Sequence, residues 1–294
     1  MLMLNLSCLF WAVNIILGSM LSDYVGPWFI MSLRAFIGSF LFLIILSSKG
    51  YLKEIVHLQH KGLIFGMSLT GVVGFQALLY YGLRWTTPVN SSVIGASAPI
   101  ISLLLAALIL SEKLSLHKIG AILISFIGVL FVLSKGRLET FYNLEFNVGD
   151  ILIFSAIFFW GVYSVMGEVV MKRVSALHVT AASIFISAIV TLPIAYWETT
   201  TQITPRIDLF VILSIITIGI FPTVISFLLW NKGVQQIGSS HASLYLNTIP
   251  MYTILLTYIF LDGLILPYQV IGMMFIASGS LYLFFANIYE KQSI

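Results

Sequence analysis

Charged side chains are scarce in this chain. Asp, Glu, Lys and Arg make up only 9% of its 294 residues, whereas 60% of the residues are hydrophobic. So few ionisable groups cannot cover a soluble globule of this size, and the composition therefore predicts a protein embedded in a lipid bilayer. The net charge of +3 is small and scattered along the chain, which argues against nucleic acid as a partner.

Cysteine is nearly absent, and the common motifs of catalysis are missing. The single cysteine, Cys8, excludes an intramolecular disulfide. His57 and His60 lie in one predicted loop without further ligands nearby, whereas a zinc site needs three or four. The sequence contains no P-loop, HExxH or nucleophile-elbow motif. We therefore expect no metal, no cofactor, no enzyme activity and no direct drive by ATP.

Long apolar runs are what the chain does contain. A membrane-spanning helix needs about 20 mostly apolar residues, and ten such helices use roughly 200 positions. The runs fit ten spans joined by short polar turns, with one longer polar break at 135–149. We therefore predict an all-α integral membrane fold of ten transmembrane helices. The predicted spans are residues 3–22, 27–48, 62–83, 90–111, 117–134, 149–171, 177–197, 208–230, 241–261 and 267–288.

The basic residues predict how these spans are oriented. Cytoplasmic loops retain Lys and Arg, and an inside N-terminus places nine of these residues in inner segments and four in outer ones. The inner residues are Lys49, Lys53, Lys61, Lys113, Lys118, Lys172, Arg173, Lys232 and Lys291. The outer residues are Arg84, Lys135, Arg137 and Arg206. We therefore predict a multi-pass protein of the cell membrane with both termini in the cytoplasm.

Two distant stretches of the chain, Asn90–Lys113 and His241–Asp262, are similar. Aligning Pro99 with Pro250, an offset of 151, also matches one serine pair and three leucine pairs. Because each half holds five spans, an odd number, the second copy is inverted relative to the first. Inverted repeats are typical of secondary transporters, whose binding site lies at the repeat interface. The predicted division is a first repeat at 1–134, an extracytoplasmic linker at 135–148 and a second repeat at 149–294.

Several segments together resemble the drug/metabolite transporter superfamily, and within it the bacterial ten-helix proteins with two EamA domains. In the first half these are FWAVN (Phe10–Asn14), Arg34 in the second span, YYGL (Tyr80–Leu83) and SAPIISLLLAALILSEKLSLHKIGA. In the second half they are FWGVY, LLWNKGVQQIGSSHASLYLNTIP and IGMMFIASGSLYL. The resemblance covers nearly the whole chain in the right order. It implies export of metabolites, with amino acids or related compounds as substrates.

Polar residues inside the predicted spans are the candidates for function. Arg34 lies seven residues past Pro27, about 10 Å along its helix. An arginine at the centre of a spanning helix costs about 2.5–3.5 kcal/mol on an insertion scale, so it needs partners. Two roles remain open for Arg34, a structural clamp or a contact with substrate or gate. Acidic residues are nearly absent from the predicted spans, which argues against proton coupling.

Aromatic and polar residues at helical spacing are candidates for a substrate cavity. Trp11 and Asn14 share one helix face, and Trp160 and Tyr163 repeat their spacing in the second half. These pairs either wall a central cavity or serve helix packing. On the ninth predicted span His241, Tyr245, Thr248 and Tyr252 form a stripe, matched on the fourth by Asn90, Ile94, Ser97 and Ile101. The predicted cavity residues are Trp11, Asn14, Gln76, Tyr80, Ser97, Trp160, Tyr163, Trp230, Tyr245 and Thr248.

The two prolines of the similar stretches are predicted helix breaks. Pro99 and Pro250 lack an N–H group, so each leaves a carbonyl of its own helix without a partner. The leading hypothesis is a secondary transporter that exports a small amphipathic metabolite by alternating access. The alternatives are a passive facilitator or channel, and an integral membrane enzyme acting on lipid-linked substrates. The expected partners are a small-molecule substrate and the bilayer, with the oligomeric state open and a monomer plausible.

Overall fold

The computed structural model describes residues 2–110, 116–137, 139–140 and 147–292, and within these ranges every regular element is a helix. The α-helices of the first half are α1 (Leu2–Leu21), α2 (Pro27–Ser48), α3 (Leu52–Val56), α4 (Lys61–Met67), α5 (Phe75–Gly82), α6 (Pro88–Gly95), α7 (Ala98–Leu110) and α8 (Leu116–Leu133). Those of the second half are α10 (Val148–Val170), α11 (Ala176–Thr201), α12 (Leu209–Ile218), α13 (Phe227–Ile237), α14 (Ser239–Ser243), α15 (Ile249–Leu261) and α16 (Pro267–Gln292). Two π-helical segments, Ser68–Gly74 and Gly219–Ser226, and a 3₁₀ segment, Leu244–Thr248, connect some of these helices end to end.

Eight helical stretches of the described chain are long and apolar enough to cross a membrane. They are Leu2–Leu21, Pro27–Ser48, Lys61–Gly82, Pro88–Ile109, Val148–Val170, Ala176–Thr201, Leu209–Ile237 and His241–Leu261. They correspond to the first four predicted spans and to the sixth through the ninth. The fifth and tenth predicted spans form the helices α8 and α16, and their crossing of the bilayer stays a prediction. The protein is therefore a multi-pass helical membrane protein.

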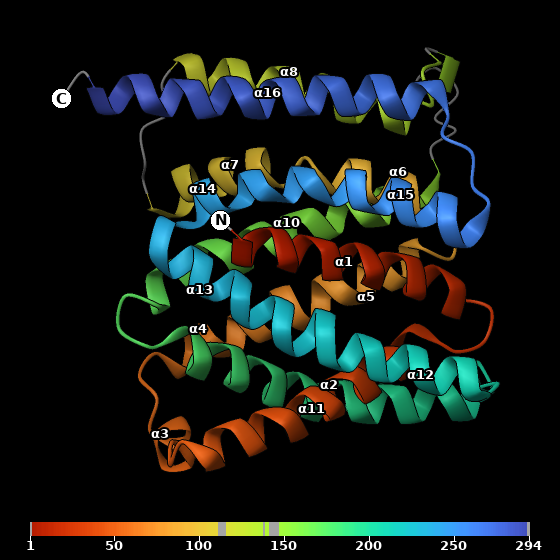
Figure 1. Ribbon diagram of the computed structural model, residues 1–294, viewed down its shortest axis with the longest axis vertical. Helices are drawn as coiled ribbons and strands as arrows, with labels where there is room; N and C mark the ends of the chain where they lie inside the picture. Colours follow the sequence, from red (N-terminus) through yellow and green to blue (C-terminus); the bar gives the residue numbers. More distant parts are fainter. Residues whose placement is uncertain (1, 111–115, 138, 141–146, 293–294) are drawn as a thin grey trace.

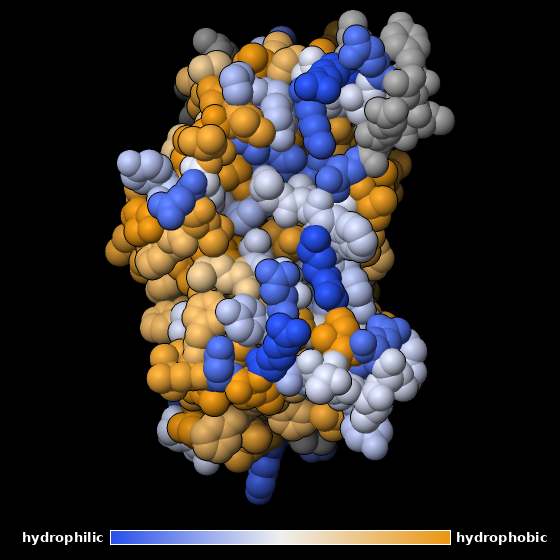
Figure 2. Space-filling model, turned by 90° about the vertical axis from the view of Figure 1, so that its right-hand side faces the viewer, coloured by the Kyte–Doolittle hydropathy of each residue, from blue (hydrophilic) through white to orange (hydrophobic). Residues whose placement is uncertain are grey.

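The long helices lie side by side in a stack (Figure 1). The pair α8 and α16 forms one edge, the pair α2 and α11 lies near the opposite edge, and α1 and α10 run through the middle. One end of the stack carries residues 22–26, which connect α1 to α2, and we call it the α1–α2 end. Figure 2 views this end: hydrophilic residues gather along its middle, while hydrophobic residues cover much of its sides. Apolar flanks of this kind are expected of helices that face lipid.

Glycines let the helix pair α8 and α16 pack backbone to backbone. A Cβ atom on Gly128 would lie 2.7 Å from the carbonyl oxygen of Gly272, and one on Gly279 would lie 2.8 Å from that of Ala121. Ser125 adds a hydrogen bond of 3.3 Å from its hydroxyl to the backbone oxygen of Ile276. Small residues at such crossings give tight packing, which holds membrane helices together where lipid offers no hydrophobic driving force.

Both similar stretches of the sequence are interrupted just before their prolines. The helix α6 ends at Gly95 and α7 begins at Ala98, because Pro99 has no N–H to donate to the carbonyl of Gly95. Ahead of Pro250 the chain forms α14, then the 3₁₀ segment, and only then α15. The predicted stripe of the ninth span is therefore wrong as a continuous α-helical face. The 3₁₀ segment has about 3.0 residues per turn instead of 3.6, which changes the angular spacing of the side chains.

The two π-helical segments were not predicted from the sequence. Ser68 and Gly219, where these segments begin, are 219 − 68 = 151 residues apart, which is the offset between the two prolines. In the second segment Pro222 cannot donate to the carbonyl of Ile218, and the hydroxyl of Thr223 donates to that carbonyl instead, at 2.8 Å. The distortion thus places a hydroxyl group in the interior, where Arg34 bonds to it.

Candidate functional site

A small cavity lies among the middle helices. Its volume is about 60 Å³, which by the space that one water needs holds roughly four to six water molecules. Both halves of the chain contribute to its wall. The lining residues are Trp11, Asn14 and Ile15 of α1, Phe75, Gln76 and Leu79 of α5, Ser91, Ser92 and Gly95 of α6, Ala98 of α7, Ile153, Ala156, Ile157 and Trp160 of α10, Leu246 of the 3₁₀ segment and Ile249 of α15. A metabolite needs more room, so its entry requires these helices to move.

Arg34 on α2 lies directly behind the polar part of this cavity. Its side chain is only 3% exposed. Its Nε donates to the hydroxyl of Thr223 at 2.7 Å, and its Nη1 donates to Oε1 of Gln76 at 2.7 Å and to the hydroxyl of Tyr80 at 2.8 Å. A longer contact of 3.3 Å joins Nη1 to Oδ1 of Asn14. One guanidinium group therefore connects α2 with α1, α5 and the second π-helical segment.

The charge of Arg34 has no carboxylate partner in the described part of the chain. The ion pair found there joins His178 to Glu54, with 3.2 Å between Nε2 and Oε2. The Nη2 atom of Arg34 is buried and makes no hydrogen bond with any described residue. Burying a charge that lacks a counter-ion costs several kcal/mol, so such a group is retained only where something repays the cost. The guanidinium group thus donates to four neutral acceptors, while its positive charge is not paired with any carboxylate of the described chain.

Arg34 and Tyr80 determine how two amide side chains of the cavity wall are turned. Arg34 can only donate, so Asn14 and Gln76 present their carbonyl oxygens to it. The hydroxyl of Tyr80 donates to the same Oδ1 of Asn14, at 2.6 Å. Within the described chain, neither amide nitrogen donates to another residue, although Asn14 and Gln76 are 2% and 1% exposed. The NH₂ groups of both residues therefore remain available to the cavity that these residues line.

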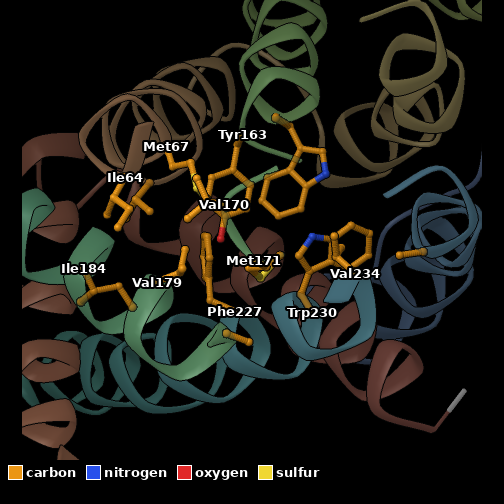
Figure 3. Packing of buried hydrophobic residues seen from close by; sticks show 14 of the residues in the cluster. Ile64, Met67, Tyr163, Val170, Met171, Val179, Ile184, Phe227, Trp230 and Val234 are labelled. Atoms are coloured by element: carbon orange, nitrogen blue, oxygen red, sulfur yellow. The ribbon is translucent and has the colours of Figure 1, made fainter. Parts of the chain in front are cut away.

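An aromatic cluster also borders the cavity. The ring of Trp160 lies 5.0 Å from that of Trp11, edge to face, and 5.4 Å from that of Trp230. Figure 3 shows Trp230 and Phe227 of α13 in the same packed group as Tyr163 of α10. The indole nitrogens of all three tryptophans are buried and have no partner among the described residues. Of these tryptophans, Trp11 and Trp160 line the cavity.

A second buried pair mirrors the pair of Asn14 and Tyr80. The hydroxyl of Tyr163 and the amide of Asn231 are hydrogen bonded, with 2.8 Å from Nδ2 to the hydroxyl oxygen, and the same Nδ2 donates to Thr180. Tyr163 stands 149 residues after Asn14, and Asn231 stands 151 residues after Tyr80. The two halves thus make the same helix-to-helix contact with asparagine and tyrosine exchanged. Within the described chain, no arginine bonds to this second pair.

The structure brings together four of the ten predicted cavity residues at the cavity wall: Trp11, Asn14, Gln76 and Trp160. Tyr80 lies one layer behind them, and Tyr163 and Trp230 belong to the buried aromatic cluster.

The other three predicted residues are not among the lining residues. The hydroxyl of Ser97 bonds to the carbonyl of Ile94 at 2.7 Å, and that of Thr248 bonds to the carbonyl of Tyr245 at 2.8 Å. The third residue is Tyr245. Leu246, which follows Tyr245, and Ile249, which follows Thr248, line the cavity instead.

Two buried acids were not among the candidate residues predicted from the sequence. Glu198 falls one residue beyond the predicted seventh span, but α11 continues to Thr201 and Glu198 is completely buried. Its Oε2 accepts a hydrogen bond of 2.9 Å from the backbone N–H of Phe29 in the first turn of α2. Asp150 is also completely buried. Because the span Ala176–Thr201 includes Glu198, the expectation that acids are nearly absent from the spans is corrected at this position.

Both acids join elements of the two halves at the α1–α2 end. Glu198 accepts from Phe29 and, at 3.3 Å, from the hydroxyl of Tyr81. Asp150, at the start of α10, accepts from the hydroxyl of Thr86 and from Nδ2 of Asn90, the latter at 3.3 Å. The Glu198 carboxylate also meets the positive end of the α2 dipole. These contacts hold α11 against α2 and α10 against α6.

Comparisons with known proteins agree with this architecture. The chain matches the EamA-like transporter family over residues 1–134 and 147–285. The uncharacterized transporter YyaM of Bacillus subtilis (strain 168) is 30% identical over 215 residues, which cover 73% of this chain and 70% of that protein. A protein of Streptantibioticus cattleyicolor, named as a probable terminal-alkyne amino-acid exporter, is 23% identical over 209 residues, 69% of this chain and 66% of its own. A crystal structure with 18% sequence identity has the same fold, with a TM-score of 0.70 over 96% of this chain and 95% of that one.

Proposed function

The chain belongs to the EamA-like transporter family, and from this premise we propose that it exports amino acids or related amphipathic metabolites as a secondary transporter. Its assignment as a membrane transporter follows from the family and from relatives that are named as transporters. What we propose beyond this is the substrate class, amino acids or related amphipathic metabolites. A distant relative is named as an amino-acid exporter, and the cavity combines apolar walls with a few buried polar groups, which suits an amphipathic solute.

The observation that carries the proposal is the position of the cavity. Its walls come from α1, α5, α6 and α7 of the first half and from α10, the 3₁₀ segment and α15 of the second. Secondary transporters bind substrate between two halves that move against each other. In its present form the cavity has room for only a few waters, so the substrate enters when the halves separate on one side. The interruptions before Pro99 and Pro250 supply hinges next to the cavity.

We further propose that the two halves, 1–134 and 149–294, are inverted repeats of five spans each, joined by a linker at 135–148. The two π-helical segments stand 151 residues apart, and the two asparagine–tyrosine pairs occupy equivalent positions, which supports a duplication. In this arrangement both termini lie in the cytoplasm and the α1–α2 end faces outward from the cell membrane. Glu198 and Asp150 then close the outer side of the cavity.

An export assay tests the proposal. Cells that produce the protein, and matched cells without it, are preloaded with a panel of labelled amino acids, dipeptides and their analogues, and the loss of each compound is followed. Faster loss of at least one compound from the producing cells is the expected result. The proposed substrate class is wrong if no amino acid or analogue leaves faster. Flux that rises linearly with concentration and never saturates would identify a passive channel instead.

A further inference from the structure

Most polar side chains of the cavity wall carry a hydrogen-bond donor that has no partner in the described chain. The indole N–H groups of Trp11 and Trp160 and the hydroxyl of Ser91 are buried and make no hydrogen bond within the described chain. Asn14 and Gln76 line the same space, their oxygens accept hydrogen bonds from Arg34, and their NH₂ groups donate to no described residue. No Asp or Glu is among the residues that line the cavity. The side chains of the wall carry no carboxylate, and its serine hydroxyls can donate as well as accept, so this composition favours a ligand group that accepts hydrogen bonds.

The charge behind the wall decides what kind of acceptor fits best. Arg34 lies within 2.7 Å of Gln76 and within 3.3 Å of Asn14, measured from Nη1 to the two amide oxygens. Its positive charge has no carboxylate partner among the described residues. In a buried site of low dielectric such a charge favours an anion over a neutral acceptor. A carboxylate also repays the cost of burying Arg34, which a neutral hydroxyl or carbonyl group does to a much smaller extent.

We propose that this cavity recognises its substrate by a carboxylate, which accepts hydrogen bonds from the amide groups of Asn14 and Gln76. Arg34 is a positioning residue in this arrangement: it turns both amides and supplies the charge without touching the ligand. The apolar side chains of Ile15, Leu79 and Ile153 surround the body of the substrate. The substrate is therefore a carboxylate with an apolar side chain, and its amino group is not the recognised feature. This inference rests on the proposed function but concerns binding, which is measured without transport.

A matched series of four compounds tests the recognition. Leucine carries the carboxylate and the amine, 2-hydroxy-4-methylpentanoate lacks the amine, 3-methylbutylamine lacks the carboxylate, and leucinamide replaces the carboxylate by a neutral amide. The purified full-length protein is titrated with each compound, and binding is followed by the intrinsic fluorescence of its tryptophans, two of which line the cavity. We expect both carboxylates to bind about tenfold or more tightly than the amine and the amide, as expected for hydrogen bonds to a charged group.

The variant Gln76→Glu makes the test specific to this site. The new carboxylate has the shape of the original amide and gives Arg34 the counter-ion that it lacks, so the fold is retained. The cavity loses one donor and gains a negative charge, so binding of both carboxylates weakens about tenfold or more, and the preference over leucinamide disappears. Gln202→Glu, the same change at an exposed residue at the end of α11, leaves all four affinities unchanged.

Two Arg34 variants separate charge from structure. Arg34→Lys keeps the positive charge and is expected to retain part of the preference for carboxylates. Arg34→Gln removes the charge and is expected to lose this preference. The inference is overturned if the carboxylates bind wild type no more tightly than the amine and the amide, which includes binding of none of the four. It is also overturned if Gln76→Glu keeps the preference. Failure of the export assay with preserved carboxylate binding would refute the proposed transport and leave this recognition standing.

Discussion

The contact of Glu198 with α2 predicts how strongly one buried acid stabilises the fold. Gly26 is the residue before the first turn of α2 and has no side chain to cap the helix, and Pro27 has no N–H. The carboxylate of Glu198, from the end of α11, accepts the N–H of Phe29 at 2.9 Å in its place. Losing a helix cap costs about 0.5–2 kcal/mol, and losing a charge at the helix N-terminus costs up to about 2 kcal/mol in a partly buried setting.

These free energies predict that Glu198→Ala destabilises the protein more than Glu198→Gln does. Glu198→Ala removes the acceptor and the charge and leaves the partly buried N–H of Phe29 without this acceptor, so we expect a loss of about 2–3 kcal/mol. Glu198→Gln keeps an acceptor of the same shape and also removes the cost of burying a charge, so we expect a loss of about 1 kcal/mol or less. At about 2–4 °C per kcal/mol, the melting temperature falls by roughly 4–12 °C for alanine and by a few degrees at most for glutamine.

Thermal unfolding of the purified protein measures this ranking. Thr199→Ala is the matched control, because Thr199 neighbours Glu198 on the same helix, is partly exposed and bonds only to the carbonyl of Tyr196 one turn earlier. The reasoning is refuted if Glu198→Ala melts within a degree or two of the control. If Glu198→Ala and Glu198→Gln lower the melting temperature equally, the loss comes from the charge alone. That result would refute the contribution that we assign to the hydrogen-bond acceptor.

Three further predictions follow from the packing. Trp160→Phe removes an unpartnered indole N–H from the cavity wall and is expected to raise the KM for export several-fold with little change in the amount of protein in the membrane, as read by immunoblot. Gly128→Leu places a side chain against the backbone of Gly272 and is expected to cost about 1–3 kcal/mol in thermal unfolding, whereas Gly62→Leu, which meets open space, costs much less. Cys8 is completely buried, so maleimide is expected to label it only after denaturation; fast labelling of the folded protein would contradict its placement.

Much of the candidate site was predictable from single helices. Trp11, Asn14, Gln76 and Trp160 stood out because polar or large aromatic side chains inside an apolar span need a reason to be there, and all four line the cavity. Ser91 was missed because a serine near a span end has many ordinary roles. Glu198 was missed because hydropathy places the end of a helix only to within several residues, and α11 extends past the predicted end.

The sequence by itself determined the class of the protein and eight of its predicted spans, because composition and spacing along one helix depend only on neighbouring residues. The other two spans and the duplication stay predictions. It left two roles open for Arg34 and assigned Tyr245 to the cavity from a helical stripe. Only the tertiary structure decided that Arg34 meets residues 20, 42, 46 and 189 positions away. It also showed that a 3₁₀ segment interrupts the stripe. The physical reason is that the orientation of a buried amide depends on partners from other helices, and only packing brings those partners together.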